Sequence, residues 1–577
     1  MEVFSKITDE GRFPDEGYRV NDTAKAYCRT ILDVVSAHGV REVVCSPGSR
    51  NTPLLIAAAA RAELRKHVVA DERCAAFMAL GIAAAGRKPV ALVCTSGTAL
   101  LNYAPAVAEA FYQGVPLIVI TADRPSQWID QDDSQTIRQA GALAAVVKGS
   151  YDLPVCRAGD EGLQRLCRRR VCDAIMQAIT PSRGPVHINI QIDEPIDAVA
   201  DDADDDFTFP ELIRPETTIP QNEVKELADA ISNARKVLIV AGFMPPSPSL
   251  AHCLAALPAN CAVLCEAQSN LRGPFAGNID ATLRAMSAQE KEELLAPEVV
   301  VTIGGSLLSR MIKSELRSRK FEHWSIGTCG HCLDPLLNLT RRIECTPDTL
   351  FRQLVPLLKS SAGDYRGRWL QASANAMLRS CEFLQSAPWS DYTAMGLLLG
   401  ALPDGTNLHL SNGTAVRYAQ LFDYSAAARV ECNRGVSGID GCTSTAIGAA
   451  MTSEAPTLLV TGDMSAQYDI GALATPGIPA TFRMVVLNNS GGGIFRFIKA
   501  TRDLPEMERY LAADVRLPLR DIAGGFGFDY YEARNAAMLR AVMPRFFAEG
   551  PQPCILNIVT PAQASAETIR KYFNPQQ

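Results

Sequence analysis

The chain has 577 residues, of which 47% are hydrophobic and 21% charged, and this composition excludes a disordered or fibrous protein. The length predicts about three domains. The formal net charge of -7 leaves no basic excess to neutralise phosphates, so we expect neither a nucleic acid nor a membrane surface as a partner.

Three features of the sequence predict a cytoplasmic protein. The N-terminal stretch, which includes Asp9, Glu10, Asp15 and Glu16, lacks the basic and then apolar order of a secretory signal. No run reaches the ~18 consecutive apolar residues that a membrane-spanning helix needs. The 17 cysteines are odd in number and several stand in apolar runs, so we expect them to be reduced and buried.

From about residue 40, short apolar runs alternate with longer helical patterns. This alternation is typical of parallel strands joined by helical crossovers. It predicts a first unit over residues 20–195, with helices over 51–64, 72–86 and 98–112 and strands over 42–46, 66–70, 89–94, 116–121 and 185–190.

An acidic, proline-containing stretch follows the first unit. Acidic residues gather between Asp193 and Asp206, and Pro210, Pro215 and Pro220 come next. Such a segment cannot bury a core, so residues 196–222 are predicted to be a linker.

Two further units repeat the alternation. A middle unit covers 223–360, with a helix near 223–234 and strands at 237–241 and 299–303. A third unit covers 370–577, with strands near 407–411, 428–432, 457–461, 483–488 and 554–559. The predicted fold class is therefore α/β, with three doubly wound parallel-sheet domains, and ligands are expected at the carboxyl ends of the strands.

Two of these strand ends carry oxygen-bearing side chains. Asp463 follows one strand, and Asn489 and Gly491 follow another; Asn489 stands 26 positions after Asp463. A carboxylate, an amide oxygen and a carbonyl freed by a glycine suit Mg²⁺ that bridges phosphates. A helix starting near Ser465 would point its first amides, including that of Met464, at the same place. Either piece alone is typical of an ordinary turn, whereas the pair in this order favours a metal and diphosphate site.

A Gly-Asp pair followed at this interval by Asn-Asn resembles the cofactor motif of thiamine-diphosphate enzymes. Further strings resemble those of the SEPHCHC synthase family, which acts in menaquinone biosynthesis. They are Ser46-Pro47-Gly48-Ser49-Arg50, Asp71-Glu72-Arg73, Thr95-Ser96-Gly97-Thr98, Thr121-Ala122-Asp123-Arg124-Pro125 and Arg434-Gly435-Val436-Ser437-Gly438-Ile439-Asp440-Gly441. The resemblance implies thiamine diphosphate and Mg²⁺ or Mn²⁺ as cofactors, and 2-oxoglutarate and isochorismate as substrates.

Glu72 follows an apolar run and opens a predicted helix. In the resembled family this acid pairs with the aminopyrimidine of the cofactor and so assists loss of the thiazolium C2 proton. An acid stabilised by the N-terminus of a helix is the plainer explanation, and it suits Asp71 equally well.

A set of arginines follows or opens elements in all three units. Guanidinium groups match carboxylates, and each implied substrate carries two of these. Ser49 and Gln135 join the arginines by motif position, although for any single arginine a surface ion pair is the commoner explanation. The predicted substrate residues are Ser49, Arg50, Arg124, Gln135, Arg310, Arg417 and Arg434.

Apolar side chains complete the predicted cofactor site. Ile494 and Phe495 follow a glycine run, and Ile439 lies in the Ser-Gly-Ile-Asp-Gly string. Apolar surroundings would disfavour charge beside the thiazolium. Core packing explains Ile439 about as well.

Three positions depart from the family pattern. Ser309 stands where a lysine is usual, Ser134 where asparagine is usual, and Met464 where the motif has glycine. The first two changes affect substrate contacts.

Two other patterns are weak. The Cys329–Cys332 pair lacks a second metal-binding pair or a redox-fold context. His187 is expected to be a satisfied sheet residue.

The resemblance also implies a homodimer or a dimer of dimers, with sites between subunits. Another 2-oxo-acid decarboxylase, of the acetolactate-synthase type, and a catalytically silent binding relative are the alternatives.

Overall fold

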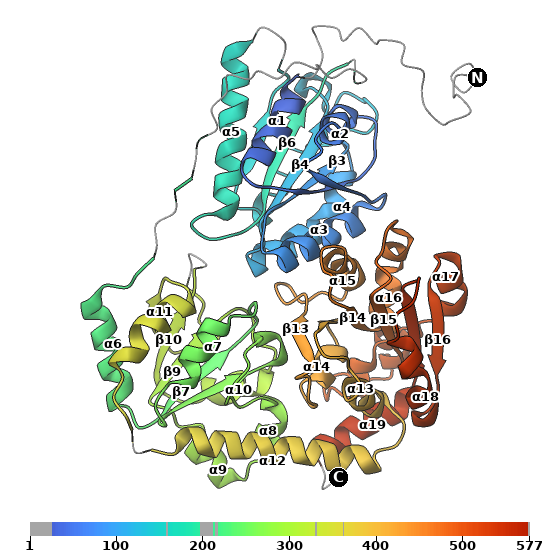
Figure 1. Ribbon diagram of the computed structural model, residues 1–577. Helices are drawn as coiled ribbons and strands as arrows, with labels where there is room; N and C mark the ends of the chain where they lie inside the picture. Colours follow the sequence, from blue (N-terminus) through green and yellow to red (C-terminus); the bar gives the residue numbers. More distant parts are fainter. Residues whose placement is uncertain are drawn as a thin grey trace.

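The computed structural model describes residues 26–156, 160–194, 217–328, 332–361 and 363–574, together with residues 196, 210, 212 and 213. Three parallel sheets form three bodies (Figure 1). The predicted fold class is confirmed. Most of the predicted linker, and Cys329 to His331 of the cysteine motif, lie outside the described residues.

The first sheet has the strand order β2-β1-β3-β4-β6-β5. Its alternating apolar residues pack on helices on both faces, with α3 and α4 on one face and α1, α2 and α5 on the other. The strands are β1 (Glu42–Cys45), β2 (Arg65–Val68), β3 (Val90–Cys94), β4 (Leu117–Asp123), β5 (Ser150–Leu153) and β6 (Val186–Gln191). The helices are α1 (Ala26–Ala37), α2 (Thr52–Ala59), α3 (Glu72–Gly86), α4 (Ala99–Gln113) and α5 (Glu161–Ile179).

The middle sheet has the order β11-β10-β9-β7-β8. Its strands are β7 (Val237–Ala241), β8 (Cys261–Cys265), β9 (Val299–Ile303), β10 (Glu322–Ile326) and β11 (Leu339–Ile343). Its helices are α6 (Gln221–Asn233), α7 (Pro248–Ala255), α8 (Ile279–Ala285), α9 (Ala288–Leu294), α10 (Arg310–Arg317) and α11 (Pro347–Leu354).

The third sheet, β13-β12-β14-β15-β17-β16, repeats the connectivity of the first. Its strands are β12 (Thr406–Leu410), β13 (Ala427–Glu431), β14 (Thr457–Gly462), β15 (Phe482–Asn488), β16 (Asp529–Ala533) and β17 (Cys554–Val559). Its helices are α13 (Asp391–Leu399), α14 (Ala415–Ala419), α15 (Cys442–Ala450), α16 (Asp463–Tyr468), α17 (Leu519–Gly525), α18 (Ala536–Phe546) and α19 (Ala562–Phe573).

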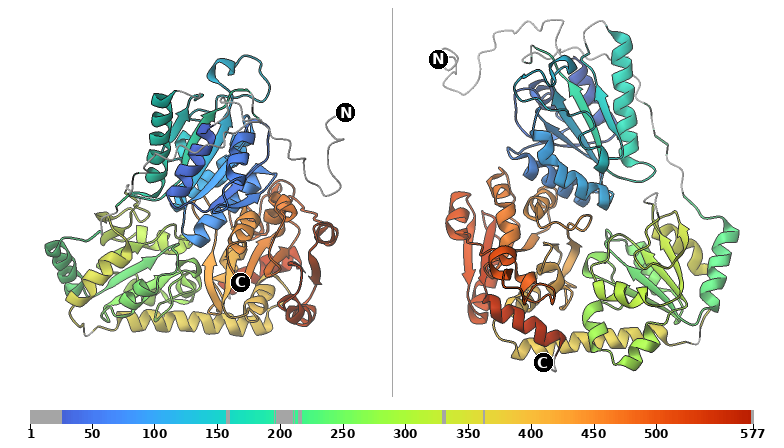
Figure 2. Two further views of the ribbon diagram at one scale, coloured as in Figure 1. Left: turned by 45° about the horizontal axis from the view of Figure 1, so that its top comes forward. Right: turned by 180° about the vertical axis from the view of Figure 1, so that it is seen from behind.

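A long helix, α12 (Tyr365–Ser386), runs beneath the middle and third units (Figures 1 and 2). Trp369 near its start is buried in the middle unit, whereas Ala376 packs into the core of the third. The predicted start of the third unit at residue 370 therefore falls inside this helix. No helix of the described residues is long and apolar enough to cross a membrane.

Helices α3 and α15 hold the first and third units together. One hydrophobic core runs continuously from the first sheet through α3, α4 and α15 to β14 and β15. The two helices approach closely at glycines: a Cβ added to Gly81 would lie 2.0 Å from the carbonyl oxygen of Thr445, and one added to Gly448 would lie 2.1 Å from that of Met78. Only glycine fits at these positions, so the position of α3 relative to the third sheet is set by backbone contact.

Candidate functional site

The switch point of the third sheet lies between β12 and β14, where connections leave in opposite directions, and Asp463 stands directly after β14. Asp463 is buried. Its Oδ1 accepts a hydrogen bond from the backbone N–H of Met464 at 2.7 Å, and its Oδ2 accepts one from Gly491 at 2.9 Å. Burial raises the pKa of Asp463 to about 6, and the nearby Asp391 carboxylate also raises it. A buried carboxylate of this kind gains from a cation beside it.

Asn489 is buried next to Asp463, and its amide has a fixed orientation. The Nδ2 group of Asn489 donates to Oδ2 of Asp391 at 2.6 Å, and Thr560 donates to Oδ1 of the same carboxylate. The amide oxygen of Asn489 is left with a 3.5 Å contact to Nη1 of Arg496. Asp391, which sequence reasoning missed, thus holds the NH₂ group of Asn489 and fixes the direction in which its oxygen can meet a ligand.

Gly491 completes the set predicted to hold a metal. Its φ is 124°, and an added Cβ would lie 2.1 Å from the carbonyl oxygen of Ala512, so no other residue fits. Among the described residues, no three His, Cys, Asp or Glu side chains gather as a metal centre. The donor set here is mixed instead, with a carboxylate, an amide oxygen and the carbonyl oxygen of Gly491, which fits Mg²⁺ or Mn²⁺ carrying a diphosphate. This carbonyl oxygen accepts one hydrogen bond, from the N–H of Gly493 at 2.8 Å, and keeps a second lone pair for a metal.

Residues 433–441, which lie between β13 and α15, are named here the 433–441 loop. It carries both Arg434 and Ile439. Ser465 of α16 donates to the carbonyl oxygen of Ile439 at 2.5 Å, and Asn412 donates to the carbonyl oxygens of Asn433 and Gly438 at 2.6 and 2.7 Å. The loop is therefore fixed against the predicted metal site.

The apolar residues predicted to contact the cofactor lie around this point. Met464, Ile439, Ile494 and Phe495 are half-buried. The helix predicted to start near Ser465 begins at Asp463 and is only six residues long.

Three of the predicted arginines gather between the middle and third units. The pKa of Arg417 lies below its ordinary value, chiefly because of burial and then because of the positive charges of Arg434 and Arg310. Arg434 is buried, donates to Oδ1 of Asn412 at 3.1 Å, and has an Nε without a hydrogen-bond partner in the described part of the chain. None of the three forms an ion pair with a described residue.

Two acids and a lysine border this arginine cluster. Glu266 is buried, which raises its pKa to about 7, and it accepts hydrogen bonds from the N–H groups of Leu308 and Ser309 at 2.8 and 2.7 Å. Ser309 also donates to Asp280. Lys313 lies one helical turn after Ser309, and its pKa is lowered first by burial and then by the charges of arginines that include Arg434 and Arg310. Lys313 thus brings a positive charge to the region where Ser309 replaces the usual lysine. Because residues four apart lie on the same face of a helix, the sequence could have indicated this lysine.

The remaining predicted substrate residues lie at the carboxyl edge of the first sheet. Arg50 is buried, donates to the carbonyl oxygen of Ile192 at 3.0 Å and forms an ion pair with Glu194 at 2.8 Å. Arg124 pairs with Asp133 at 3.0 Å. The two arginines are therefore neutralised within their own chain, unlike the cluster of Arg310, Arg417 and Arg434.

Two polar residues lie at the same edge. Ser49 is exposed. Gln135 is also exposed and donates to the carbonyl oxygen of Ser96 at 3.1 Å. The predicted substrate residues of one chain thus form two groups, one on the first unit and one on the middle and third units.

Glu72 is the first residue of α3, as predicted. The capping function belongs to Asp71, whose side chain accepts hydrogen bonds from the N–H groups of Arg73 and Cys74. Glu72 is half-buried and makes no hydrogen bond or ion pair with any described residue. Its negative charge contributes to the raised pKa values of the Cys94 thiol and of Tyr103. A half-buried carboxylate without a protein partner is suited to meet a ligand or a second chain.

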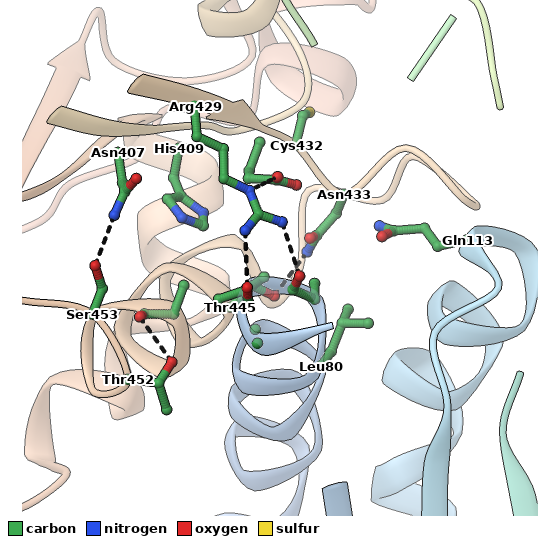
Figure 3. A pocket seen from close by; sticks show the side chains of 16 residues that line it. Leu80, Gln113, Asn407, His409, Arg429, Cys432, Asn433, Thr445, Thr452 and Ser453 are labelled. Atoms are coloured by element: carbon green, nitrogen blue, oxygen red, sulfur yellow. Dashed lines mark hydrogen bonds and ion pairs between the residues drawn. The ribbon is translucent and has the colours of Figure 1, made fainter. Parts of the chain in front are cut away.

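A cavity of about 190 Å³ lies between the C-terminal end of α3 and strands β12 and β13 (Figure 3). There Arg429 donates to the carbonyl oxygens of Ala84 and Ala85 at 2.8 and 3.0 Å and pairs with Glu431. Burial lowers the pKa of His409 to about 3, so this lining residue is neutral. None of the predicted site residues lines the cavity, and Arg429 uses its donors to hold the end of α3.

Other predicted features are structural. His187 is buried in β6 and hydrogen-bonds to Thr121 at 2.8 Å, and burial lowers its pKa to about 4. Cys332 is exposed and free, and the other residues of its motif are not described.

Comparison with known proteins agrees with this architecture. Residues 27–142 match the family described as thiamine pyrophosphate enzyme, N-terminal TPP binding domain. The crystal structure of benzoylformate decarboxylase from Polynucleobacter necessarius superposes with a TM-score of 0.70 and 16% sequence identity, covering 93% of this chain and 99% of that one. The fold and the family match define a thiamine-diphosphate-dependent enzyme.

Relatives with higher sequence identity show which family of thiamine-diphosphate-dependent enzymes this is. The 2-succinyl-5-enolpyruvyl-6-hydroxy-3-cyclohexene-1-carboxylate synthase of Porphyromonas gingivalis is 39% identical over 94% of this chain and 96% of its own length. The enzyme of the same name from Flavobacterium johnsoniae is 35% identical over 95% and 98%. The chain belongs to this family, the SEPHCHC synthases.

Proposed function

We propose that this enzyme decarboxylates 2-oxoglutarate and adds the resulting four-carbon unit to isochorismate, giving SEPHCHC for menaquinone biosynthesis. The family supports this function, and one observation on the chain itself carries it. Arg310, Arg417 and Arg434 are crowded together without ion pairs in the described chain. Crowded guanidinium groups repel one another, so a ligand that brings carboxylates relieves that repulsion.

Thiamine diphosphate, when bound, would supply a nucleophilic carbon and a group that accepts the negative charge left by loss of carbon dioxide. Glu72 would hold a proton against the pyrimidine ring nitrogen of the cofactor. This assignment is supported by the finding that no described residue pairs with the Glu72 carboxylate. Ile439, Ile494 and Phe495 would exclude water from the thiazolium side.

The diphosphate would be held through Mg²⁺ or Mn²⁺. Asp463, Asn489 and the carbonyl of Gly491 would be the protein ligands, and Met464 and Ser465 would lie beside the diphosphate. The fixed Asn489 amide and the glycine-only position at 491 support this set.

The assembly would be a homodimer or a dimer of dimers. Two features support it: Glu72 has no partner among the described residues of its own chain, and the substrate residues of one chain form two groups. Ser49, Arg50, Arg124 and Gln135 of one subunit would then face Arg310, Arg417 and Arg434 of another across isochorismate and 2-oxoglutarate.

The function is tested by measuring carbon dioxide release from 2-oxoglutarate and from pyruvate, with thiamine diphosphate and Mg²⁺ present. We expect release from 2-oxoglutarate to be faster. Strict preference for pyruvate would favour an acetolactate-synthase-like enzyme, and no release from either acid would favour a silent relative.

A further inference from the structure

We infer that Glu109 is a positioning residue, which holds the 433–441 loop and through it Arg434 and Ile439. Glu109 belongs to α4 of the first unit, whereas the loop belongs to the third. The inference rests on the proposed function, because that function gives Arg434 and Ile439 their roles toward substrate and cofactor.

The carboxylate of Glu109 binds three consecutive backbone N–H groups. Oε1 accepts a hydrogen bond from Gly435 at 2.5 Å, and Oε2 accepts hydrogen bonds from Val436 at 2.7 Å and Ser437 at 3.3 Å. Gln113, one turn later on α4, donates to Oε1 at 2.6 Å. Successive backbone N–H groups that converge on an anion form a strong, orientation-specific contact.

Because Glu109 is buried, its hydrogen bonds to the loop strongly favour the observed loop conformation. Glu109 is only 3% exposed, and no described lysine, arginine or histidine forms an ion pair with it. A buried charge is costly unless its hydrogen bonds are made. Its partners are the loop N–H groups and Gln113, so opening the loop would leave a buried carboxylate largely unsatisfied.

The loop is held from two sides. Asn412 of the third unit binds the carbonyl oxygens of Asn433 and Gly438, while Glu109 of the first unit binds the N–H groups between them. A Cβ added to Gly435 would lie 2.6 Å from the backbone oxygen of Glu109, so the backbones themselves are in contact. Figure 3 shows Gln113 of α4 facing Asn433 at the start of the loop.

Arg434 immediately precedes the bound N–H groups. Its Nη1 donates to Oδ1 of Asn412, and its buried Nε has no partner in the described chain. Fixing the backbone at residue 435 therefore fixes where this guanidinium meets a substrate carboxylate.

Glu109→Gln tests the inference, because it keeps the size of the side chain but turns an NH₂ group toward N–H donors. Hydrogen exchange of the amides of residues 435–437, measured by mass spectrometry on the full-length protein without ligands, should become about tenfold to a hundredfold faster. Glu42→Gln is the matched control, since Glu42 also lies in the first unit and bonds His67 but not the loop. Exchange should stay at the wild-type rate in this control.

The kinetic readout separates positioning from general destabilisation. In Glu109→Gln the KM for 2-oxoglutarate should rise about tenfold or more, with a smaller change in kcat. Glu109→Asp keeps the charge, so both its exchange rate and its KM should fall between those of wild type and Glu109→Gln. It also serves as the test variant if Glu109→Gln does not fold.

Unchanged exchange at residues 435–437 would overturn the inference, as would faster exchange with unchanged KM and kcat. If wild type releases no carbon dioxide from 2-oxoglutarate, the proposed function fails instead. The exchange comparison would still decide whether Glu109 holds the loop.

Discussion

Replacing Gly81 with alanine would place a methyl group against the backbone of α15. The added Cβ would lie 2.0 Å from the carbonyl oxygen of Thr445 and 3.0 Å from the backbone nitrogen of Ala449. Because both atoms belong to the backbone of a helix, no side-chain rotation can relieve the contact. Helices α3 and α15 would have to separate by about 1 Å or more to reach an ordinary van der Waals distance.

The change in the free energy of unfolding has two opposing contributions. Overpacking of a close contact costs about 1–3 kcal/mol, while alanine gains up to about 1 kcal/mol over glycine in a helix. Gly86 lies in the same helix with nothing within 4 Å of an added Cβ. Gly86→Ala should therefore gain the helix propensity of alanine without any overpacking. The two variants should therefore differ by about 2 kcal/mol in stability, with Gly81→Ala the less stable.

Calorimetric unfolding and turnover measure the two consequences. Gly81→Ala should lower the first unfolding transition, whereas Gly86→Ala should leave it unchanged or raise it. Glu72 lies at the start of the same helix, about 13 Å from Gly81, so a shift of α3 should also lower kcat about tenfold to a hundredfold. Equal transition temperatures in the two variants would refute the close approach of α3 and α15.

Three further predictions follow from the site and the sheets. Asp391→Ala removes the acceptor that orients the Asn489 amide, so binding of thiamine diphosphate with Mg²⁺, measured by calorimetry, should weaken about tenfold or more. Co-expressed Glu72→Gln and Asp463→Asn subunits, each inactive alone, should recover about a quarter of wild-type activity if one site uses both residues from different chains. The pKa of His187 is 6.5 in the unfolded chain and about 4 in the folded protein, so the unfolded chain binds a proton first as the pH falls. The stability contributed by the neutral, buried imidazole is therefore complete above pH 6.5 and is lost as the pH falls toward about 4. Relative to His187→Gln, wild type should thus lose about 3 kcal/mol across that range in urea titrations.

Each of these predictions has a control and a contrary result. Asp404→Ala, in the turn before β12, should leave cofactor affinity unchanged, and equal affinity in Asp391→Ala would refute the orienting role. Absence of recovery in mixed subunits that do assemble together would place both residues in one chain. His252→Gln, at an exposed position of α7, should show the pH dependence of wild type; the same behaviour in His187→Gln would exclude the buried histidine as the cause.

The sequence was sufficient to predict those parts of the fold that follow local patterns. The predicted helix over 72–86 matches α3, because an N-terminal acid and an alanine-rich run mark its start and course. The edge strands β5 and β16 were not predicted, since Ser150–Leu153 and Asp529–Ala533 carry polar residues that resemble loops. The helix predicted over 51–64 ends earlier, at Ala59.

The structure shows where the predicted site residues lie, but the side chains that hold them in position could not be predicted from the sequence. Glu109 stands in an alanine-rich helix and resembles an exposed helical acid, yet its partner Gly435 lies 326 residues away. Asp391 lies 98 residues from Asn489. Such contacts depend on how separate units pack, and no local pattern records them. The neutralisation of Arg50 and Arg124 within the chain was hidden for the same reason.

The central claim is that Glu72 and the arginine cluster serve one carboligation. It is tested most directly by mass spectrometry of the product formed from 2-oxoglutarate and isochorismate, with thiamine diphosphate and Mg²⁺, in wild type and Glu72→Gln. Wild type should give a product whose mass equals the sum of the two substrates less carbon dioxide, and Glu72→Gln should give almost none. Equal product from both proteins, or none from wild type, would contradict the account.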